Sequence, residues 1–426
     1  MYLCSGIQNS TAMKTKVFVL ASMIALFAAC TYNGVTQPKS LQLSPTEKEL
    51  VQHCNDFSFN LLAQVANNEE QENIILSPLS ASMLLGMLMN GADGETLAQI
   101  QRMTGFGDDI SIDDINAYYK QLMDVLPELD RATVLKIANG IWVREDFPVK
   151  DTFITACKNN FKAQARNVPS FTDENVLNDI NSFVAQQTNN RIKKVIDASM
   201  VNETTVMALL NALYFKSMWV TKFKKSDTRK GAFTTLNGQA IQTDMMHMYE
   251  EKFLFHEDTA YSMIELPYKG DEYCADIVLP GNRYERTNID IREWIKSIDD
   301  EKWQKMISSL HKTEVDLAMP KFSLNYSRRL KEDLMALGMK DAFGNDADFS
   351  NLSDRQTYVS CVDQHTFMKV DEEGTEAASV TISLMVEKAS GYYFCVDRPF
   401  LFVIRERQFG TILFAAIIGH PAWQED

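Results

Sequence analysis

The chain lacks the residue patterns on which catalysis and metal binding usually depend. None of its six histidines has a second ligand at metal-binding spacing. His256-Glu257 begins like a zinc-protease helix motif, but residue 260 is alanine, so the second histidine is missing. There is no GxSxG or Walker motif, and Gly105-Phe106-Gly107 lacks the third glycine of a dinucleotide-binding turn. We therefore expect no enzyme, no cofactor and no metal; a hydrolase assembled from residues distant in sequence is the competing interpretation.

Cysteine pairs and positive charge are also scarce. The seven cysteines show no CxxC spacing, and the five that follow Cys30 cannot all pair with one another. We expect these five to be small core side chains, with Cys395 the most accessible. The net charge of −15 argues against nucleic acid or an anionic membrane surface as the partner.

The remaining composition is that of a soluble globular protein, with 45% hydrophobic and 23% charged residues. No repeat, heptad array or low-complexity tail occurs. At 426 residues, length alone would suggest two or three domains.

The N-terminus has the features of an export signal. A short basic region, 13–16, precedes the apolar run 17–27, which is too short to span a bilayer, and Ala28-Ala29-Cys30 follows. This pattern resembles a bacterial lipoprotein signal, so residues 1–29 are predicted to be a signal peptide, with Met13 as an alternative start. Phe27 stands where such signals usually have leucine, which leaves a plain secretory signal open.

Cleavage before Cys30 would leave its thiol to carry a lipid. Residues 30–45 would then be a linker to the lipid anchor, and residues 46–426 the folded domain. Removal of residues 1–29 takes away Lys14 and Lys16 and no acid, so the net charge moves from −15 to −17. The protein is expected to cross the inner membrane and to remain lipid-anchored in the bacterial envelope, or otherwise to be extracellular.

Residues 371–388 form the most informative stretch. An acidic turn leads to Gly374, which can adopt backbone angles closed to other residues. Two alternating sets follow, one of small residues and one mainly apolar, which is the period of a strand and not of a helix. The small set is Thr375, Ala377, Ser379, Thr381 and Ser383. Taken alone, the stretch would fit an ordinary edge strand.

Other segments have their own local interpretations. Ser77-Pro78 should start a buried helix that stops near Gly91. Taken singly, residues 138–143 and 207–216 would each be an apolar strand, and Trp219 follows the second. The remaining segments of note are 265–268, 278–280, 319–322, 337–343, 398–405 and 412–416.

In this order, over about residues 46–424, these segments resemble the serpin family, the serine protease inhibitors. Asp371 to Ser379 is similar to the family's hinge motif, which the resemblance assigns to Glu372, Glu373, Gly374, Thr375, Glu376, Ala377, Ala378 and Ser379. The resemblance implies a single α+β domain, a serpin fold with three β-sheets, about nine helices and an exposed reactive-centre loop.

The fourteenth residue after Gly374 is Lys388, where serpins carry the residue whose peptide bond the protease attacks. The resemblance thus implies a trypsin-like target that is trapped as a covalent acyl-enzyme at Lys388–Ala389, because the cleaved loop inserts into the large sheet. Serpin loop insertion is a known type of switching transition. The small face of the loop favours insertion. Elastase-like, subtilisin-like or cysteine proteases attacking a shifted bond, and a non-inhibitory binding or surface protein of the same fold, are the alternatives.

The resemblance also assigns supporting residues. The shutter, where strands part for the loop, falls on Ser77, Ser80, Asn211 and Gln364. Gln364 replaces the family's histidine, and His365 should face the opposite way. The breach, where the loop enters, falls on Trp219, Lys321 and Glu372, and an ion pair between Lys321 and Glu372 is predicted.

Two surface properties complete the expectations. The basic cluster Lys222, Lys224, Lys225, Arg229 and Lys230 is interpreted as a solvated face and not as a polysaccharide site. The protein is expected to be a monomer whose apolar loop face carries a risk of loop–sheet polymerisation.

Overall fold

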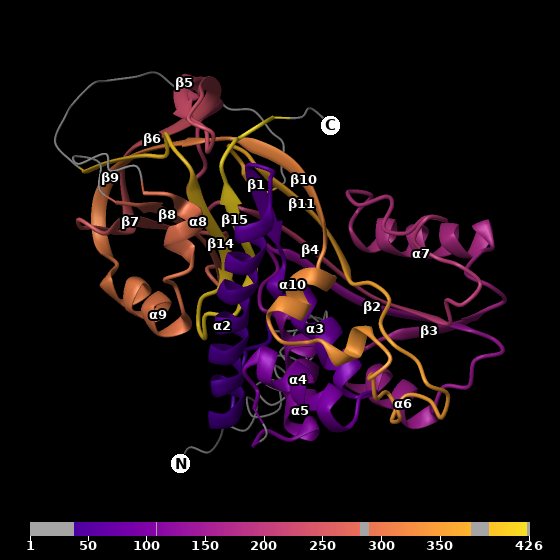
Figure 1. Ribbon diagram of the computed structural model, residues 1–426. Helices are drawn as coiled ribbons and strands as arrows, with labels where there is room; N and C mark the ends of the chain where they lie inside the picture. The colour runs from indigo at the N-terminus through magenta and orange to yellow at the C-terminus, as the bar shows by residue number, and fades with distance from the viewer. Residues whose placement is uncertain (1–37, 108, 282–288, 376–391, 424–426) are drawn as a thin grey trace, which may run out of the picture. The chain divides into compact units, whose positions relative to one another are not determined.

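The computed structural model describes residues 38–107, 109–281, 289–375 and 392–423 (Figure 1). From Ser40 onward these residues belong to one compact unit. Lipidation at Cys30, the hinge residues Glu376 to Ser379 and the reactive bond Lys388–Ala389 lie outside the described residues.

Nine α-helices occur in the described residues, and all but α6 and α10 begin at a side-chain cap. Ser44 and Glu47 form a capping box at the first helix, and Ser77 caps the second, with Pro78 at its first position. The helices are α2 Pro45–Asn68, α3 Pro78–Met89, α4 Gly94–Thr104, α5 Ile112–Val125, α6 Asp151–Phe161, α7 Glu174–Gln187, α8 Ile291–Ile295, α9 Asp300–Ser309 and α10 Lys331–Ala336. Within the described ranges, no helix is both long and apolar enough to cross a membrane.

A six-stranded sheet runs in the order β10-β11-β12-β4-β2-β3. Its strands are β2 Val134–Arg144, β3 Gln164–Val168, β4 Met207–Met218, β10 Phe322–Arg329, β11 Asp363–Val370 and β12 Gly374–Thr375. The short β12 therefore lies between two long strands.

The other strands form one network in the order β1-β15-β14-β8-β7-β6-β9-β13, with β5 paired to β6. Its strands are β1 Asn73–Leu76, β5 Arg229–Thr234, β6 Ala240–Glu257, β7 Tyr261–Pro267, β8 Tyr273–Pro280, β9 His311–Pro320, β13 Tyr392–Cys395, β14 Phe400–Glu406 and β15 Ile412–Ile418. The resemblance implies three sheets, but the second and third are joined here, because the 18-residue β6 pairs with β5, β9 and β7 along its length.

Helices pack on both sides of the six-stranded sheet. Helix α3 contacts both β4 and β15, so it connects the two sheets, and α2 packs against β15. Helix α7 covers β2 and β4 from the other side and encloses a small separate core around Trp142 and Phe183 (Figure 1). Strands β8, β14 and β15 are buried along their whole length, as expected for near-continuous apolar runs.

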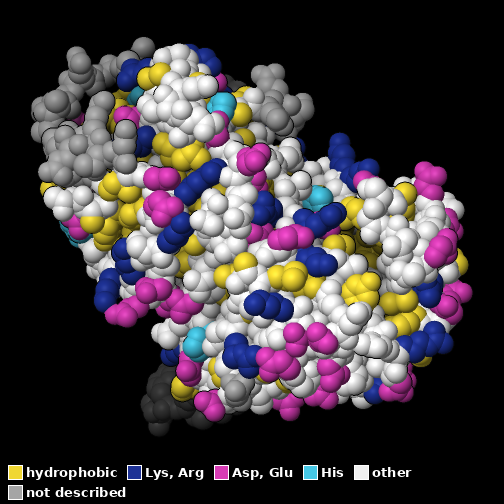
Figure 2. All heavy atoms as spheres, viewed as in Figure 1, with side chains coloured by type: hydrophobic (Ala, Val, Ile, Leu, Met, Phe, Trp, Pro, Cys, Tyr) yellow, Lys and Arg dark blue, Asp and Glu magenta, His cyan; other side chains and the backbone are white. Residues whose placement is uncertain are grey.

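The described cysteines are mostly buried, and the visible surface is mostly polar. Cys54, Cys157 and Cys274 are buried, and burial raises the pKa of Cys54 to about 11. Cys361 and Cys395 are half-buried, so Cys395 is accessible, but not uniquely so. On the face shown in Figure 2, acidic and basic side chains are interspersed.

Candidate functional site: the hinge and the β4–β11 opening

The hinge segment already lies inside the six-stranded sheet at one end. Gly374 pairs with Met218 and Thr375 with Ser217 on β4, and Thr375 also pairs with Val370 on β11. Both pairings are antiparallel, so β12 runs against two strands that share one direction. Any extension of β12 beyond Thr375 would continue between them.

Gly374 is required by the closeness of β4. Its φ is +158°, and a Cβ at this position would lie 2.1 Å from the carbonyl oxygen of Ser217 and 2.6 Å from Cα of Met218. Both are backbone atoms, which cannot move aside as the end of a side chain can. The hinge therefore passes β4 at a point where only glycine fits.

The turn before Gly374 is held by Trp219. The indole Nε1 of Trp219 donates to the carbonyl of Asp371 at 3.0 Å, and its backbone N–H donates to the carbonyl of Glu373 at 2.9 Å. The indole stacks on Tyr268, with ring centroids 4.6 Å apart. Burial raises the pKa of Asp371, whose carboxylate accepts from the Glu373 N–H at 2.9 Å. The turn is thus fixed by its own backbone and by one aromatic stack.

The Glu372 carboxylate is buried and faces two partners. Thr228 Oγ1 donates to its Oε1 at 2.7 Å, and Lys321 Nζ lies 3.8 Å from the same oxygen. The side chains of Lys321 and Glu372 are 19% and 7% exposed. The predicted Lys321–Glu372 ion pair is therefore present, at the long end of the range for such pairs, and Thr228 supplies the shorter contact.

The basic cluster is largely solvent-exposed, as expected, but two of its lysines also reach a buried acid of the hinge. Lys222 Nζ lies 2.5 Å and Lys225 Nζ 3.8 Å from the carboxylate of Glu373, which is 9% exposed. Lys230 pairs with Asp244 instead. Sequence reasoning missed Lys222 and Lys225 because about 150 residues separate them from Glu373; the one available signal is that they follow Trp219, already assigned to the breach.

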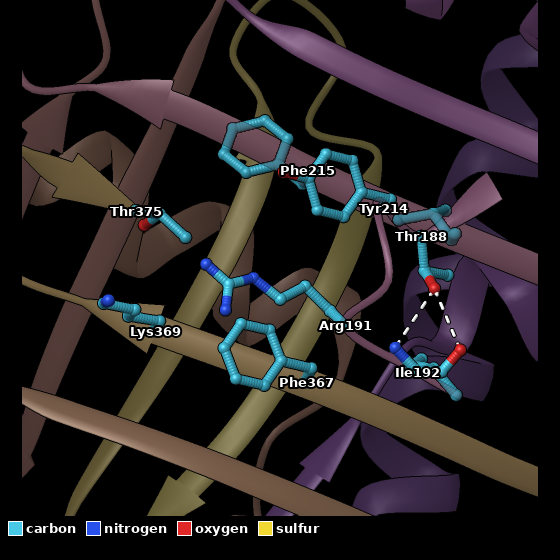
Figure 3. Close-up of a pocket in the computed structure, with 9 residues that line it drawn as sticks. Thr188, Arg191, Ile192, Tyr214, Phe215, Phe367, Lys369 and Thr375 are labelled. Carbon is cyan, nitrogen blue, oxygen red and sulfur yellow. Dashed lines mark hydrogen bonds between the residues drawn. The ribbon is translucent and has the colours of Figure 1, made fainter. Parts of the chain in front are cut away.

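A pocket lies directly beyond Thr375, between β4 and β11 (Figure 3). Thr375 is buried, and its hydroxyl lies 2.6 Å from that of Tyr268. The lining residues are Thr188, Arg191, Ile192, Leu213, Tyr214, Phe215, Phe367, Lys369 and Thr375. Three of these come from the segment after α7, which therefore crosses in front of the two strands.

Along the rest of their described length, β4 and β11 have no hydrogen-bonded pairing with each other. We call this region the β4–β11 opening. The guanidinium of Arg191 lies over the ring of Phe367 on β11, 5.1 Å from its centroid, and extends between Phe367 and Phe215 in Figure 3. Among the described residues, the inner edges of these two long strands are unpaired beyond β12, and such edges form a template for a further strand.

The shutter residues Ser77, Ser80 and Gln364 lie together. Gln364 accepts from the backbone N–H of Ser77 at 3.1 Å and donates to its carbonyl at 2.8 Å, while Ser77 Oγ accepts from the N–H of Ser80 at 3.3 Å. His365 bonds instead to the Val195 backbone in the segment after α7, so it faces the opposite side, as expected.

Asn211, the fourth shutter residue, is bonded elsewhere. Its side-chain N–H donates at 2.7 Å to Asn139 on β2, which in turn donates to the Phe161 carbonyl. The Asn211 Oδ1 atom is buried without a hydrogen-bond partner. Such an unsatisfied acceptor is rare in a folded protein and marks a site that another group could complete.

One trio of side chains within the described ranges has the spacing of metal ligands, namely Glu265, Cys274 and Asp276. Arg405 occupies the space between the acids, with contacts of 2.5 Å to Glu265 and 2.6 Å to Asp276. The trio is thus part of a buried ion-pair network, and the network leaves its oxygens committed to a guanidinium.

Comparisons with known proteins agree with this geometry. A family model described as "Serpin (serine protease inhibitor)" matches residues 52–421. Human neuroserpin is 32% identical over 377 residues, which cover 86% of this chain and 90% of neuroserpin. The native-state crystal structure of tengpin, a thermophilic serpin, is 31% identical with a TM-score of 0.79, over 90% of this chain and 97% of that one.

The fold is also shared with thyroxine-binding globulin, solved in complex with thyroxine. That structure is 26% identical, with a TM-score of 0.78, over 88% of this chain and all of the other. The family model spans most of the sequence and carries the hinge, Trp219 and Ser77 within its limits. The chain therefore belongs to the serpin family of serine protease inhibitors.

Proposed function

We propose that the protein is an inhibitory serpin, a single-use inhibitor of trypsin-like serine endopeptidases attacked at Lys388–Ala389. The observation that carries the proposal is the entry of Gly374 and Thr375 between β4 and β11, two strands that are otherwise not paired with each other in the described residues. The hinge thus stands at the start of a path that a released loop could follow.

The register of β12 supports this path. Since Gly374 lies opposite Met218 and Thr375 opposite Ser217, each further residue of an inserted strand would lie one position earlier on β4. Thr381 would then face Asn211, and by the same count on β11 it would face Gln364. The hydroxyl of Thr381 would reach the acceptor of Asn211 that has no partner here.

The same register places the small face of the loop inward. Ala377 would lie between Phe215 and Met368, both buried, and the other small residues would follow on this face. A large or charged residue on this face would collide with the buried side chains beneath the sheet. The loop composition therefore favours insertion before hydrolysis.

The chemistry follows from the protease's own steps. The serine hydroxyl of the protease attacks the Lys388 carbonyl, the Ala389 amine leaves with a proton, and an ester links the protease to Lys388. Insertion would then draw the ester, with the attached protease, along the six-stranded sheet. The strain would distort the catalytic site of the protease. Hydrolysis of the ester requires accurate placement of the oxyanion donors and base, so distortion prolongs the intermediate.

Incubation with trypsin tests the proposal. We expect an SDS-stable complex at the summed mass of the two proteins less the released fragment, and that fragment should have a new N-terminus at Ala389. Thr381→Arg should be cleaved at the same bond without forming the complex, because the inserted strand could not pass Asn211. Clean cleavage of the unmodified protein without any complex would contradict the proposal and favour a non-inhibitory binding role, such as the one named for thyroxine-binding globulin.

We also propose export and lipid anchoring through Cys30, with the folded domain a monomer in the bacterial envelope. The support is the order of basic, apolar and small residues before Cys30. Metabolic labelling with a radioactive fatty acid should mark the protein in bacteria and leave Cys30→Ser unlabelled. Secretion of an unlabelled protein would contradict anchoring and support a plain secretory signal.

A further inference from the structure

Trp423, in the segment after β15, lies against two lysines beside the hinge. Lys321 Nζ is 4.5 Å and Lys369 Nζ 5.1 Å from the centroid of the indole, within the range of cation–π contacts. The Ser323 N–H donates to the carbonyl of Ala422 at 2.8 Å, so the backbone next to Trp423 is attached to β10. We call Trp423, Lys321 and Lys369 the indole clasp.

The two lysines come from different parts of the sheet. Lys321 directly precedes β10, and its backbone N–H donates to the Asp244 carbonyl at 3.0 Å. Lys369 is on β11, opposite Ser323 on β10. The attachment of Ala422 to Ser323 therefore brings one indole within reach of both side chains. The two ammonium groups on one indole repel each other, and an aromatic face in contact with both offsets that repulsion.

One lysine of the clasp pairs with an acid of the hinge turn, and the other acts on the charge of the acid before it. Lys321 Nζ lies 3.8 Å from Glu372 Oε1. Lys369 lies close enough to Asp371 to lower its pKa, against the larger effect of burial, which raises it. Lys369 also lines the pocket beyond Thr375 (Figure 3). The clasp thus connects Trp423 to Asp371 and Glu372, the first two acids of the turn that precedes Gly374.

From this geometry we infer that Trp423 is a positioning residue that holds the hinge at Thr375 until the loop is cleaved. A lysine side chain has large rotamer entropy, and contact with the indole reduces the freedom that Lys321 would lose on pairing with Glu372. Without the indole, the hinge turn loses oriented cations at Asp371 and Glu372. Residues beyond Thr375 would then enter the β4–β11 opening without cleavage. The inference rests on the proposed function, because it concerns the same insertion.

Conversion of the purified protein without any protease tests the clasp. Samples are held at a raised temperature, and the native fraction is followed on native gels as a form with higher thermal stability accumulates. Trp423→Leu keeps an apolar side chain but has no aromatic face, whereas Trp423→Phe keeps one. We expect Trp423→Leu to convert about 5- to 30-fold faster than the unmodified protein, the effect of two partly exposed cation–π contacts together. Trp423→Phe should stay within about threefold.

Phe409→Leu is the matched control. Lys48 lies over the ring of Phe409, 5.6 Å from its centroid, so this variant also removes an aromatic face from beneath a lysine. It should convert within about twofold of the unmodified rate, because no hinge acid is involved. Equal rates for Trp423→Leu and Trp423→Phe, or an equal acceleration by Phe409→Leu, would overturn the inference.

The two proposals fail in different ways. If the unmodified protein forms no complex with trypsin, the proposed inhibition is contradicted, while the protease-free conversion rates still test the clasp. If the complex forms and the Trp423 variants convert at the unmodified rate, inhibition stands and the clasp is wrong.

Added salt should accelerate the unmodified protein more than Trp423→Leu, because it screens contacts that the variant lacks.

Discussion

Three acids and one glycine hold the chain where it enters the sheet. Glu372 and Glu373 each meet lysines and the turn carbonyls bond to Trp219, so the hinge is fixed by side chains as well as by backbone. All three acids are buried, and each buried carboxylate without a partner would carry a large desolvation cost. The hinge is therefore held by interactions that single substitutions can remove.

Substitution of Gly374 tests whether the closeness of β4 requires a glycine at this position. Gly374→Ala would place a methyl group against the backbone of Ser217 and Met218, so β12 must move out of the sheet. We expect the free energy of unfolding of the native form to fall by about 1–3 kcal/mol, the usual cost of overpacking. Gly344→Ala is the control, because a Cβ there meets no atom within 4 Å and should cost little. Urea unfolding of both variants makes the comparison, and an equal cost at both positions would refute the steric requirement.

Substitution of Glu372 tests whether its pair with Lys321 holds the hinge in place. Glu372→Lys would place a second cation beside Lys321 in a buried site and remove the acceptor of the Thr228 hydroxyl. Loss of one partner from a buried pair costs about 3–5 kcal/mol, and the longer distance here favours the low end. We expect faster spontaneous insertion or polymerisation, measured by native gels. Glu301→Lys at the exposed Lys305 pair should behave as the unmodified protein, and an unchanged thermal profile for Glu372→Lys would count against the pairing.

At the scale of elements, the site consists of two strands and the segment that crosses them. The segment between α7 and β4 contributes Arg191 over Phe367 and receives a bond from His365. A strand that enters the β4–β11 opening has to pass beneath this segment. The contacts of this segment with β11 would therefore oppose insertion. The contact made by His365 depends on pH.

His365 supplies that pH dependence. Burial lowers the pKa of His365 below 6.5, although Asp363 and the bond to Val195 act in the opposite direction, and its Nε2 is buried without a partner. Above pH 6.5 the side chain is neutral in both the folded and the unfolded chain. As pH falls below 6.5 the unfolded chain binds a proton first, so folded stability is lost toward the lower folded-state pKa.

We therefore expect the midpoint of thermal unfolding of the native form to fall between about pH 7 and pH 5. His365→Asn keeps a donor for Val195 and should remove part of this decrease. The same slope in the variant and in the unmodified protein would assign the effect to other groups. His256 is a suitable control, since its pair with Asp258 lies on the other sheet.

The elements were predictable where the signal is local. Ser77-Pro78 predicted the start of α3, and its end at Met89 lies two residues before the expected stop at Gly91. Strand β4 covers the segment 207–216 that was expected in a strand, and Gln364 and His365, neighbours on β11, face opposite ways as predicted. Such features depend only on neighbouring residues in the sequence, so one sequence is enough to predict them.

The remaining features depend on distant contacts. Nothing near Lys222 indicates that it meets Glu373, and nothing near Asn211 indicates that Asn139, and not the Ser77 group, is its partner. The fusion of two expected sheets follows from the length of β6, whose pairing changes along the strand. Trp423 has no sequence signal at all, because its partners lie on two other segments.

For the whole molecule, the two sheets share α3 and one large core, and the second core under α7 lies beside the opening. Insertion would add a strand to the six-stranded sheet without disturbing the fully buried strands β8, β14 and β15. Under the proposed function, the native form would be the less stable of two arrangements of one chain, and the hinge contacts would determine how long it persists.

Amide hydrogen exchange before and after cleavage of the loop tests this account most directly. The loop is cut by limited proteolysis and the exchange of backbone amides is compared by mass spectrometry. Insertion should slow exchange in the cleaved form for peptides from Met207–Met218 and Asp363–Val370, with peptides from His311–Pro320 unchanged as the internal reference. Unchanged exchange in β4 and β11 after complete cleavage would contradict insertion between them.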